Sequence, residues 1–220
     1  KSLKEQRAIY LILSNSDDAI RKIEDEIEVA EKLKRGLMKI LFKEDFKKFN
    51  LGDDNVSQIT DGSHFSPKVD KQGKFKIATV AHKINNAIDI NSCKNISEKD
   101  FDQLVKNGCK PKNGDVLFSK DGTVGLSFSF RQEGKLVLLS SIAIISPREI
   151  LDSNYCAYVL KSPLVIRQIF GSKRGTGLKR IILSDLKKIK IPIPYPEDKN
   201  KSLFNLTNRN IFFIYISIFI

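Results

Sequence analysis

The sequence is poor in side chains that hold metals or form disulfides. It has two histidines, His64 and His82, and three cysteines, Cys93, Cys109 and Cys156, in 220 residues. The cysteines are odd in number and widely spaced, a pattern that favours reduced thiols in a cytoplasmic protein over a disulfide framework or a zinc site. No cluster of cysteines or carboxylates accompanies either histidine. The sequence therefore predicts no metal site.

Long apolar runs are also missing. No stretch of 18 or more apolar residues occurs, so the sequence predicts no membrane-spanning helix. No signal-peptide pattern opens the chain either. An apolar content of 41% and 14 phenylalanines are enough for a folded core. Because the first residue is Lys1 and the single methionine is Met38, we expect the chain to be part of a longer protein.

Motifs for catalysis are a third absence. The basic, glycine-containing loop at residues 172–180 lacks the Gly-Lys-Ser/Thr ending of a P-loop, and it precedes an expected strand instead of following one. Asp115 and Asp121, together with Lys120, resemble the acidic set of a nuclease, but both aspartates flank turns. No methyltransferase motif is found. We therefore expect no catalytic residues and no cofactor.

Residues 17–42 show the pattern of a long helix. Apolar residues recur there at intervals of three and four, and charges of both signs fill the remaining positions. A helix of this length spans about 39 Å, and its narrow apolar seam is typical of pairing with another long helix. The positions predicted to pair are Ile20, Ile23, Ile27, Ala30, Leu37 and Leu41. The alternative is an amphipathic helix that lies on its own domain.

A capping box of Ser2 and Glu5 precedes this helix, in a lead-in that either breaks near Asn15 or runs through. Beyond the helix the sequence alternates between short strands and helices. Strand patterns occur at residues 56–60, 75–81, 115–119, 126–130, 136–145 and 189–194. Helix signals occur at residues 97–108, 153–160 and 162–171, with Ser184 capping a short turn. We expect the strands between residues 115 and 145 to form an antiparallel meander, which makes the fold class α+β.

Basic residues are concentrated in residues 161–190, which hold nine of them against the single Asp185. Such a field favours a polyanionic partner, and arginine is suited to pairing with phosphates or guanine edges. The predicted DNA contacts are Ser63, His64, Lys68, Lys120, Lys173, Arg174, Lys179 and Arg180. The alternatives are a solvated surface for the basic loop and, for His64, a turn residue bonded to its own backbone.

Several short motifs then occur in a characteristic order. They are Leu3-Lys4-Glu5-Gln6, Leu33-Lys34-Arg35-Gly36-Leu37-Met38, Asp61-Gly62-Ser63-His64 followed by Pro67, Gly114-Asp115-Val116-Leu117, Gly122-Thr123-Val124-Gly125 and Ile191-Pro192-Ile193-Pro194. Over about residues 1–196 the chain resembles half of a specificity subunit from a type I restriction–modification system. Each motif is loose alone, and the order and spacing carry the resemblance.

The resemblance implies a division into three parts. Residues 1–48 would be a coiled-coil spacer helix, residues 49–196 a mixed α/β DNA target recognition domain, and residues 197–220 an atypical tail. In this family two recognition domains each read half of a split site in double-stranded DNA, held apart by paired helices. The implied partners are DNA, the modification and restriction subunits, and a second recognition domain or second copy of the chain. Catalysis belongs to the other subunits, and no membrane is involved.

Two departures from the family pattern stand out. Only the second of the family's two recognition domains is represented, as in a C-terminal half, and Glu5-Gln6 does not recur after Pro196, where Asp198-Lys199-Asn200-Lys201 and an apolar run follow instead. We interpret residues 197–220 as a shifted reading frame or a truncated copy. Two rival hypotheses remain: the recognition end of a fused restriction–methyltransferase, and a helix-mediated assembly module that does not touch DNA.

Overall fold

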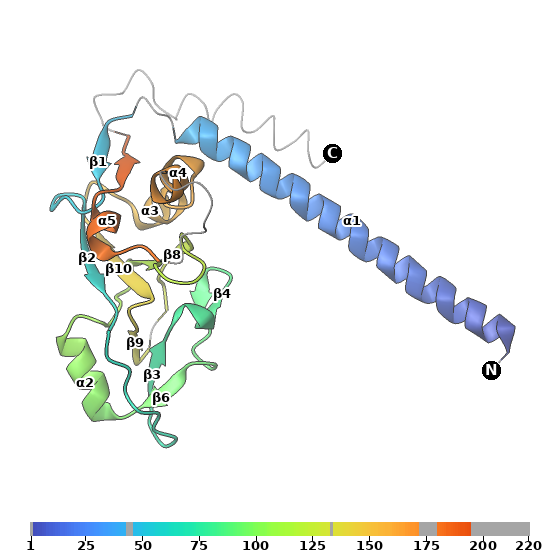
Figure 1. Cartoon of the computed structure of the whole chain (residues 1–220), viewed down its shortest axis with the longest axis horizontal. Helices are drawn as coiled ribbons and strands as arrows, with labels where there is room; N and C mark the ends of the chain where they lie inside the picture. The colour runs from blue at the N-terminus through green and yellow to red at the C-terminus, as the bar shows by residue number, and fades with distance from the viewer. Residues whose placement is uncertain (1, 43–45, 133, 172–179, 195–220) are drawn as a thin grey trace. The chain divides into compact units, whose positions relative to one another are not determined.

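The chain divides after Leu41 into two units, Lys1–Leu41 and Phe42–Ile220. The computed structural model describes residues 2–42, 46–132, 134–171 and 180–194, drawn in colour in Figure 1. The basic-loop residues 172–179 and the tail predicted at residues 197–220 lie outside these ranges. In the described part of the chain, no helix is both long enough and apolar enough to cross a membrane.

The first unit is one continuous helix, α1, from Leu3 to Leu41. The predicted capping box forms: Ser2 N donates to Glu5 Oε2 (2.7 Å), and Glu5 N donates to Ser2 Oγ (3.3 Å). The helix does not break near Asn15, and the hydroxyl of Ser16 donates within it to the carbonyl oxygen of Ile12 one turn earlier (3.0 Å), so this polar side chain is satisfied inside the helix. Its 39 residues span about 58 Å, longer than the 39 Å expected for the charged stretch alone.

The predicted seam residues all lie on α1. Ile20, Ile23, Ile27 and Ala30 are exposed, and Leu37 and Leu41 lie in the last two turns. Surface ion pairs spaced three or four residues apart lie along α1, such as Lys32 Nζ to Glu28 Oε1 (2.7 Å). Such exposed pairs contribute only about 0.3–0.5 kcal/mol each.

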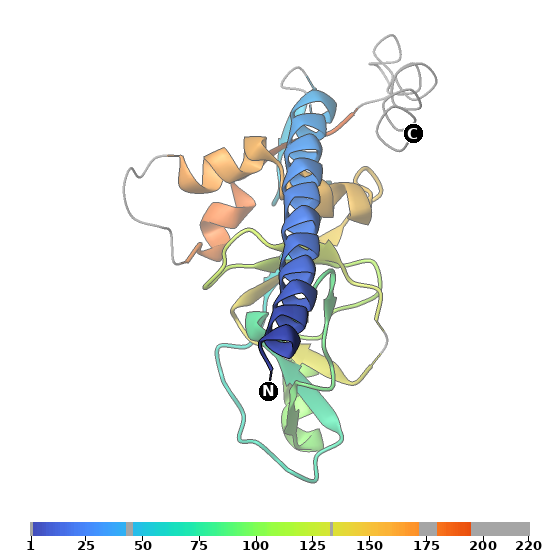
Figure 2. The ribbon, with the colours of Figure 1, turned by 90° about the vertical axis from the view of Figure 1, so that its right-hand side faces the viewer.

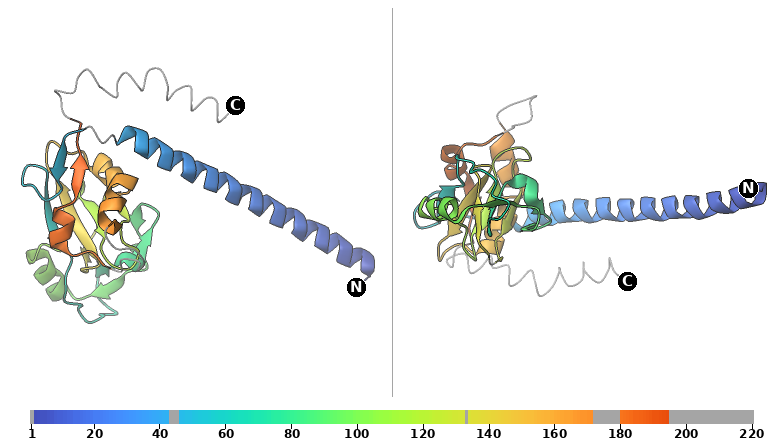
Figure 3. Two further views of the ribbon diagram at one scale, coloured as in Figure 1. Left: turned by 45° about the horizontal axis from the view of Figure 1, so that its top comes forward. Right: turned by 90° about the horizontal axis from the view of Figure 1, so that it is seen from below.

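The second unit is built on two sheets. The larger is antiparallel, with strand order β2 (Ser57–Asp61), β10 (Ile142–Pro147), β7 (Val116–Ser119) and β8 (Ser127–Ser129). The smaller has the order β6 (Lys94–Ile96), β3 (Phe75–Ala78) and β9 (Leu136–Leu138), and its β3–β9 pair is parallel. Figure 3 shows the second unit from two further directions.

The stretch predicted as one strand over residues 136–145 is two strands in different sheets. It turns at residues 139–141, where Ile142 N donates to the carbonyl of Leu139 (3.0 Å). The β7–β8 hairpin forms as predicted, but β10 pairs with the other side of β7, so the three segments do not follow one another as a simple meander. Continuous apolar character could not reveal this change of sheet, because both strands are buried.

Smaller elements complete the unit. Two more strand pairs are β1 (Lys48–Asn50) with β11 (Lys190–Pro192), and β4 (Lys83–Ile84) with β5 (Ala87–Ile88). The 3-10 turn η1 (Val80–His82) comes directly before β4. The helices are α2 (Glu98–Lys106), α3 (Ser153–Val159), α4 (Pro163–Phe170) and α5 (Leu183–Lys187). In Figure 2, α2 lies at the end of the unit away from β1 and β11.

Local capping signals were mostly correct. Ser97 accepts from Asp100 N, and Ser162 accepts from Val165 N with Pro163 at the start of α4. The Ser184 cap was wrong: α5 begins after Ile182 without a side-chain cap, so Ser184 lies inside the helix.

Two clusters of buried apolar residues among the described residues of the second unit meet at β9. One lies against the smaller sheet and α2, where the rings of Phe75 and Phe101 stand 4.4 Å apart between centroids. The other is shared by both sheets and includes Leu136 and Leu138 of β9, whose Val137 faces the first cluster. Because successive side chains of a strand point to opposite faces, β9 joins the two clusters into one core.

We predict that the three thiols are inert in the folded protein. Cys93, Cys109 and Cys156 are buried, and burial raises the pKa of each, that of Cys93 to about 11. The thiolate is the reactive form, so at pH 8 the folded chain should react with Ellman's reagent far more slowly than the urea-unfolded chain, which exposes all three. Rapid reaction of even one thiol in the folded chain would contradict this.

Candidate nucleic-acid interface

Three turns meet where the two sheets join. They are residues 61–65, 119–125 and 139–141, together called the loop cluster. Ser63 N donates to the carbonyl of Leu138 (2.7 Å), Ser140 N donates to the carbonyl of Ser63 (2.9 Å), and Lys120 N donates to the carbonyl of Ser141 (2.8 Å). These bonds satisfy backbone groups that strand pairing leaves open, so the cluster is fixed by its own main chain.

Gly62 explains the glycine in the Asp-Gly-Ser-His motif. A Cβ at Gly62 would overlap the carbonyl group of Leu139, so only glycine allows this close approach of the two turns. The Ser63 hydroxyl then closes its own turn: it donates to the carbonyl of Phe65 (2.7 Å) and accepts from Phe65 N (3.0 Å). Gly62 and Ser63 of the motif therefore fix the shape of this turn.

A buried ion pair joins the first two turns. Lys120 Nζ lies 2.6 Å from Asp61 Oδ2, with the side chains 1% and 18% exposed. His64 Nε2 lies 3.1 Å from the same oxygen, and its side chain is 68% exposed. The second carboxylate oxygen, Oδ1, is buried and has no hydrogen-bond partner among the described residues. Removing either charge would leave the other buried and uncompensated, which is far costlier than keeping the pair.

The basic segment, residues 173–180, ends at the same cluster with Arg180. Arg180 forms an antiparallel bridge with Asp121, and its Nε lies 3.3 Å from Asp121 Oδ1. The next residue, Ile181, donates its N–H to the carbonyl of Lys120 (2.9 Å). The guanidinium-bearing side chain is about half exposed (52%) and so stands at the surface of the cluster.

The structure therefore brings together four predicted contacts: Ser63, His64, Lys120 and Arg180. Of these, His64 and Arg180 are exposed, while Ser63 and Lys120 are buried. The exposed Lys68 lies a few residues further along the segment that follows the first turn. Lys173, Arg174 and Lys179 lie outside the described residues.

Two aspartates of the cluster were not predicted as site residues. Asp61 belongs to the Asp-Gly-Ser-His motif, but its pairing with a lysine 59 positions away carries no local signal in the sequence. Asp121 and Asp115 resemble a nuclease pair in the sequence, but the two aspartates lie beyond opposite ends of strand β7. Asp115 accepts hydrogen bonds from Lys112 N (2.6 Å) and the hydroxyl of Ser146 (2.7 Å), which is a structural role.

No described part of the cluster offers a metal centre. In the ranges that the structure describes, no three histidine, cysteine or acidic side chains gather closely enough to hold an ion. What the cluster does present is a fixed support with the exposed side chains of His64 and Arg180 at its surface, and the Arg180 guanidinium, paired with Asp121 through Nε, is of the kind that binds anionic partners.

The sequence of residues 43–209 matches the family described as the type I restriction modification DNA specificity domain. The chain belongs to this family. Members of this specificity family are non-catalytic components of type I restriction–modification complexes, in agreement with the prediction that this chain is not an enzyme. The predicted resemblance is thereby confirmed.

Three comparisons place this specificity domain among known proteins. The specificity subunit of the type I restriction enzyme MjaVIII from Methanocaldococcus jannaschii is 26% identical over 245 residues, covering 93% of this chain and 54% of that protein. The HsdS subunit of Thermoanaerobacter tengcongensis has a similar fold, with a TM-score of 0.52, 20% identity, and coverage of 94% of this chain and 50% of that one. A chain from a study of complex assembly and conformational transition in the type I R-M system gives a TM-score of 0.55, 18% identity, and coverage of 94% and 52%. The chain thus spans about half the length of these relatives, and the expected fold class is confirmed.

We predict that the Asp61–Lys120 pair stabilises the specificity domain as a unit. Lys120→Met or Asp61→Leu alone should lower the free energy of unfolding by about 3–5 kcal/mol, because each leaves a buried charge. The double variant should lose much less than the sum of the two. Urea unfolding of the full chain measures all three.

Lys188→Met is the control for this cycle. Lys188 is 79% exposed and pairs with Asp185 at 3.9 Å, so its loss should change the unfolding free energy by at most about 1 kcal/mol. A Lys120→Met variant as stable as Lys188→Met would show that the buried pair does not hold the turns together.

Proposed function

We propose that the chain is one half of a type I specificity subunit and reads one half of a bipartite DNA target. The match of residues 43–209 to the DNA specificity family carries this proposal. The loop cluster supports it, since it presents His64 and Arg180 on a base held by backbone bonds and a buried ion pair. Binding residues are commonly placed on loops that a rigid scaffold positions.

In this proposal the cations divide the work of binding. Lys68, Arg180 and the basic residues before Arg180 contact phosphates, which fix register and orientation without reading sequence. Base edges are read from the turns of the loop cluster, where His64 is exposed. Ser63 and Lys120 are buried and contribute indirectly, by fixing the turns that carry the contacting residues.

In this proposal helix α1 mediates assembly with other subunits. We propose that α1 pairs through its seam with the helix of a second recognition domain or a second copy of the chain, and that modification and restriction subunits dock on the result in the cytoplasm. The exposed positions Ile20, Ile23 and Ile27 favour this, because a row of isoleucines in water is costly unless a partner covers it. The 39 residues of α1 would hold two recognition domains apart along the DNA.

DNA binding should be strongly salt-dependent and should depend on the basic segment. Alanine at Lys173, Arg174, Lys179 and Arg180 should flatten the slope of log K against log salt by about 0.9 for each phosphate that the chain no longer neutralises. Filter binding of the full chain to a DNA duplex between low and high salt measures this slope.

A charge-matched control replaces Lys94, Lys99, Lys106 and Lys110 by alanine. These exposed lysines lie on β6, α2 and the segment after it, outside the loop cluster. They should leave the slope nearly unchanged. Equal slopes for both quadruple variants would mean that net charge, and not the basic segment, governs binding.

The seam should govern association and not the folding of the second unit. Ile27→Asp places a charge in the proposed helix interface, where leaving it unpaired costs several kcal/mol, so pairing should be abolished. Val29→Asp is the matched control, because Val29 is similarly exposed but lies on the other side of the helix. Sedimentation measures pairing, and melting of residues 42–220 should be the same in both variants. Loss of pairing in both variants would refute the proposal that α1 pairs through its apolar seam.

A further inference from the structure

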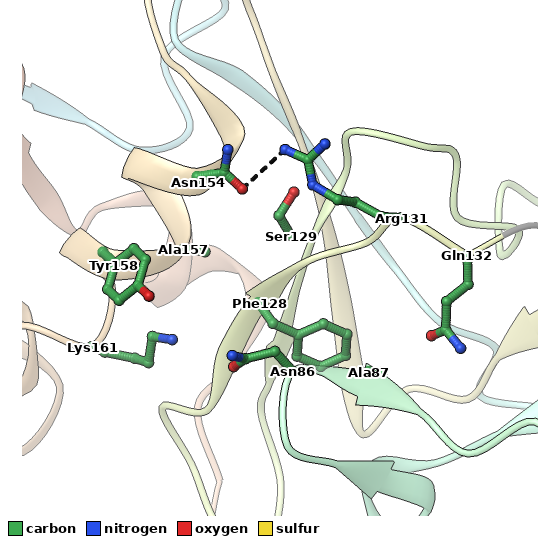
Figure 4. A pocket seen from close by; sticks show the side chains of 10 residues that line it. All are labelled: Asn86, Ala87, Phe128, Ser129, Arg131, Gln132, Asn154, Ala157, Tyr158 and Lys161. Atoms are coloured by element: carbon green, nitrogen blue, oxygen red, sulfur yellow. Dashed lines mark hydrogen bonds between the residues drawn. The ribbon is translucent and has the colours of Figure 1, made fainter.

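A small pocket lies in the second unit outside the loop cluster. It has a volume of about 290 Å³ and is walled by the turn between β4 and β5, by residues 128–132 and by α3 with the residues that follow it (Figure 4). We call it the Arg131 pocket. Sites for whole drug-sized ligands usually occupy about 300–1,000 Å³, so a volume at the lower limit suits a single small group.

The walls of the Arg131 pocket are held by hydrogen bonds. Gln132 fastens the β4–β5 pair, since its Oε1 accepts from Ile88 N and its Nε2 donates to the carbonyl of Ile88, both at 2.8 Å. Ser127 fastens α3, since its hydroxyl donates to the carbonyl of Ala157 (2.8 Å). The pocket is therefore formed before any ligand arrives, which lowers the entropic cost of binding.

Each polar side chain that lines the pocket either carries a positive charge or has a group that can donate a hydrogen bond. Arg131 is positioned by Asn154, whose Oδ1 accepts from Nη2 at 3.1 Å, and the Nζ of Lys161 lies 4.7 Å from the ring centroid of Tyr158. None of the described lining residues is acidic. The Ser129 hydroxyl is buried without a hydrogen-bond partner among the described residues. In the view of Figure 4 this hydroxyl points into the space between Arg131 and Asn154.

We propose that the Arg131 pocket binds a phosphate group. A guanidinium has five N–H donors in a fixed fork, so the bond to Asn154 leaves Arg131 able to grip an oxyanion. Lys161 adds a second positive charge from another wall, and the Ser129 hydroxyl gains the acceptor that it lacks. A tetrahedral phosphate can meet donors from several walls at once, which a planar carboxylate cannot do equally well. The phosphate is either a free anion or one of a DNA backbone.

The test is a titration of the full chain with inorganic phosphate at constant ionic strength, followed by the amide NMR signals of Ser129 and Arg131. These signals should shift and saturate. In Arg131→Gln/Lys161→Gln binding should weaken at least tenfold, and Ser129→Ala, which keeps both charges, should also weaken it. Lys99→Gln/Lys106→Gln removes the same charge from α2 and should bind phosphate as the unaltered chain does.

The possible results separate clearly. Shifts that do not saturate, equal weakening in the α2 control, or tighter binding of acetate than of phosphate would overturn the proposal. A DNA duplex added to the phosphate-loaded chain identifies the source: displacement of phosphate indicates a backbone phosphate, and retention indicates a free anion. Because the phosphate titration contains no DNA, its result does not depend on whether the chain reads a DNA target.

Discussion

The contact between Asp61 and Lys120 is the constraint on which the loop cluster depends. It joins the turn after β2 to the turn after β7 at 2.6 Å, with the lysine almost wholly buried. A buried charge tolerates little movement, because any displacement from its partner exposes the full desolvation cost. The main-chain bonds of residues 139–141 then add the third turn. Three turns that lie far apart in sequence are therefore held together as one surface.

The rigid support of the loop cluster has a consequence for recognition. DNA bases are discriminated by hydrogen-bond donors and acceptors placed within bonding distance, so a side chain that reads a base is useful only if its backbone is fixed. His64 lies two residues after Gly62, a position where any Cβ would overlap the carbonyl group of Leu139. Arg180 contacts Asp121 through both a backbone bridge and a side-chain ion pair. Exposed side chains on these residues can vary without disturbing the support beneath them.

The division between what sequence could and could not predict follows the range of the interaction. The caps at Ser2, Ser97 and Ser162 are contacts over three residues, and each was predicted correctly. The turn at residues 139–141 was missed, since the groups that bind its backbone come from Ser63 and Lys120, far away in the chain. For the same reason Lys120 could be singled out as a site residue, but its burial against Asp61 could not be foreseen.

The two units differ in how much apolar surface they bury within themselves, and this difference bears on the proposed assembly. A helix in a protein gains most of its stability from packing of an apolar face, yet Ile20, Ile23 and Ile27 of α1 are exposed. The second unit has its own core, in which β9 joins two apolar clusters. A second helix would therefore change the order of α1 far more than that of the recognition unit. Pairing through the seam would then set the separation of two preformed reading surfaces without altering either one.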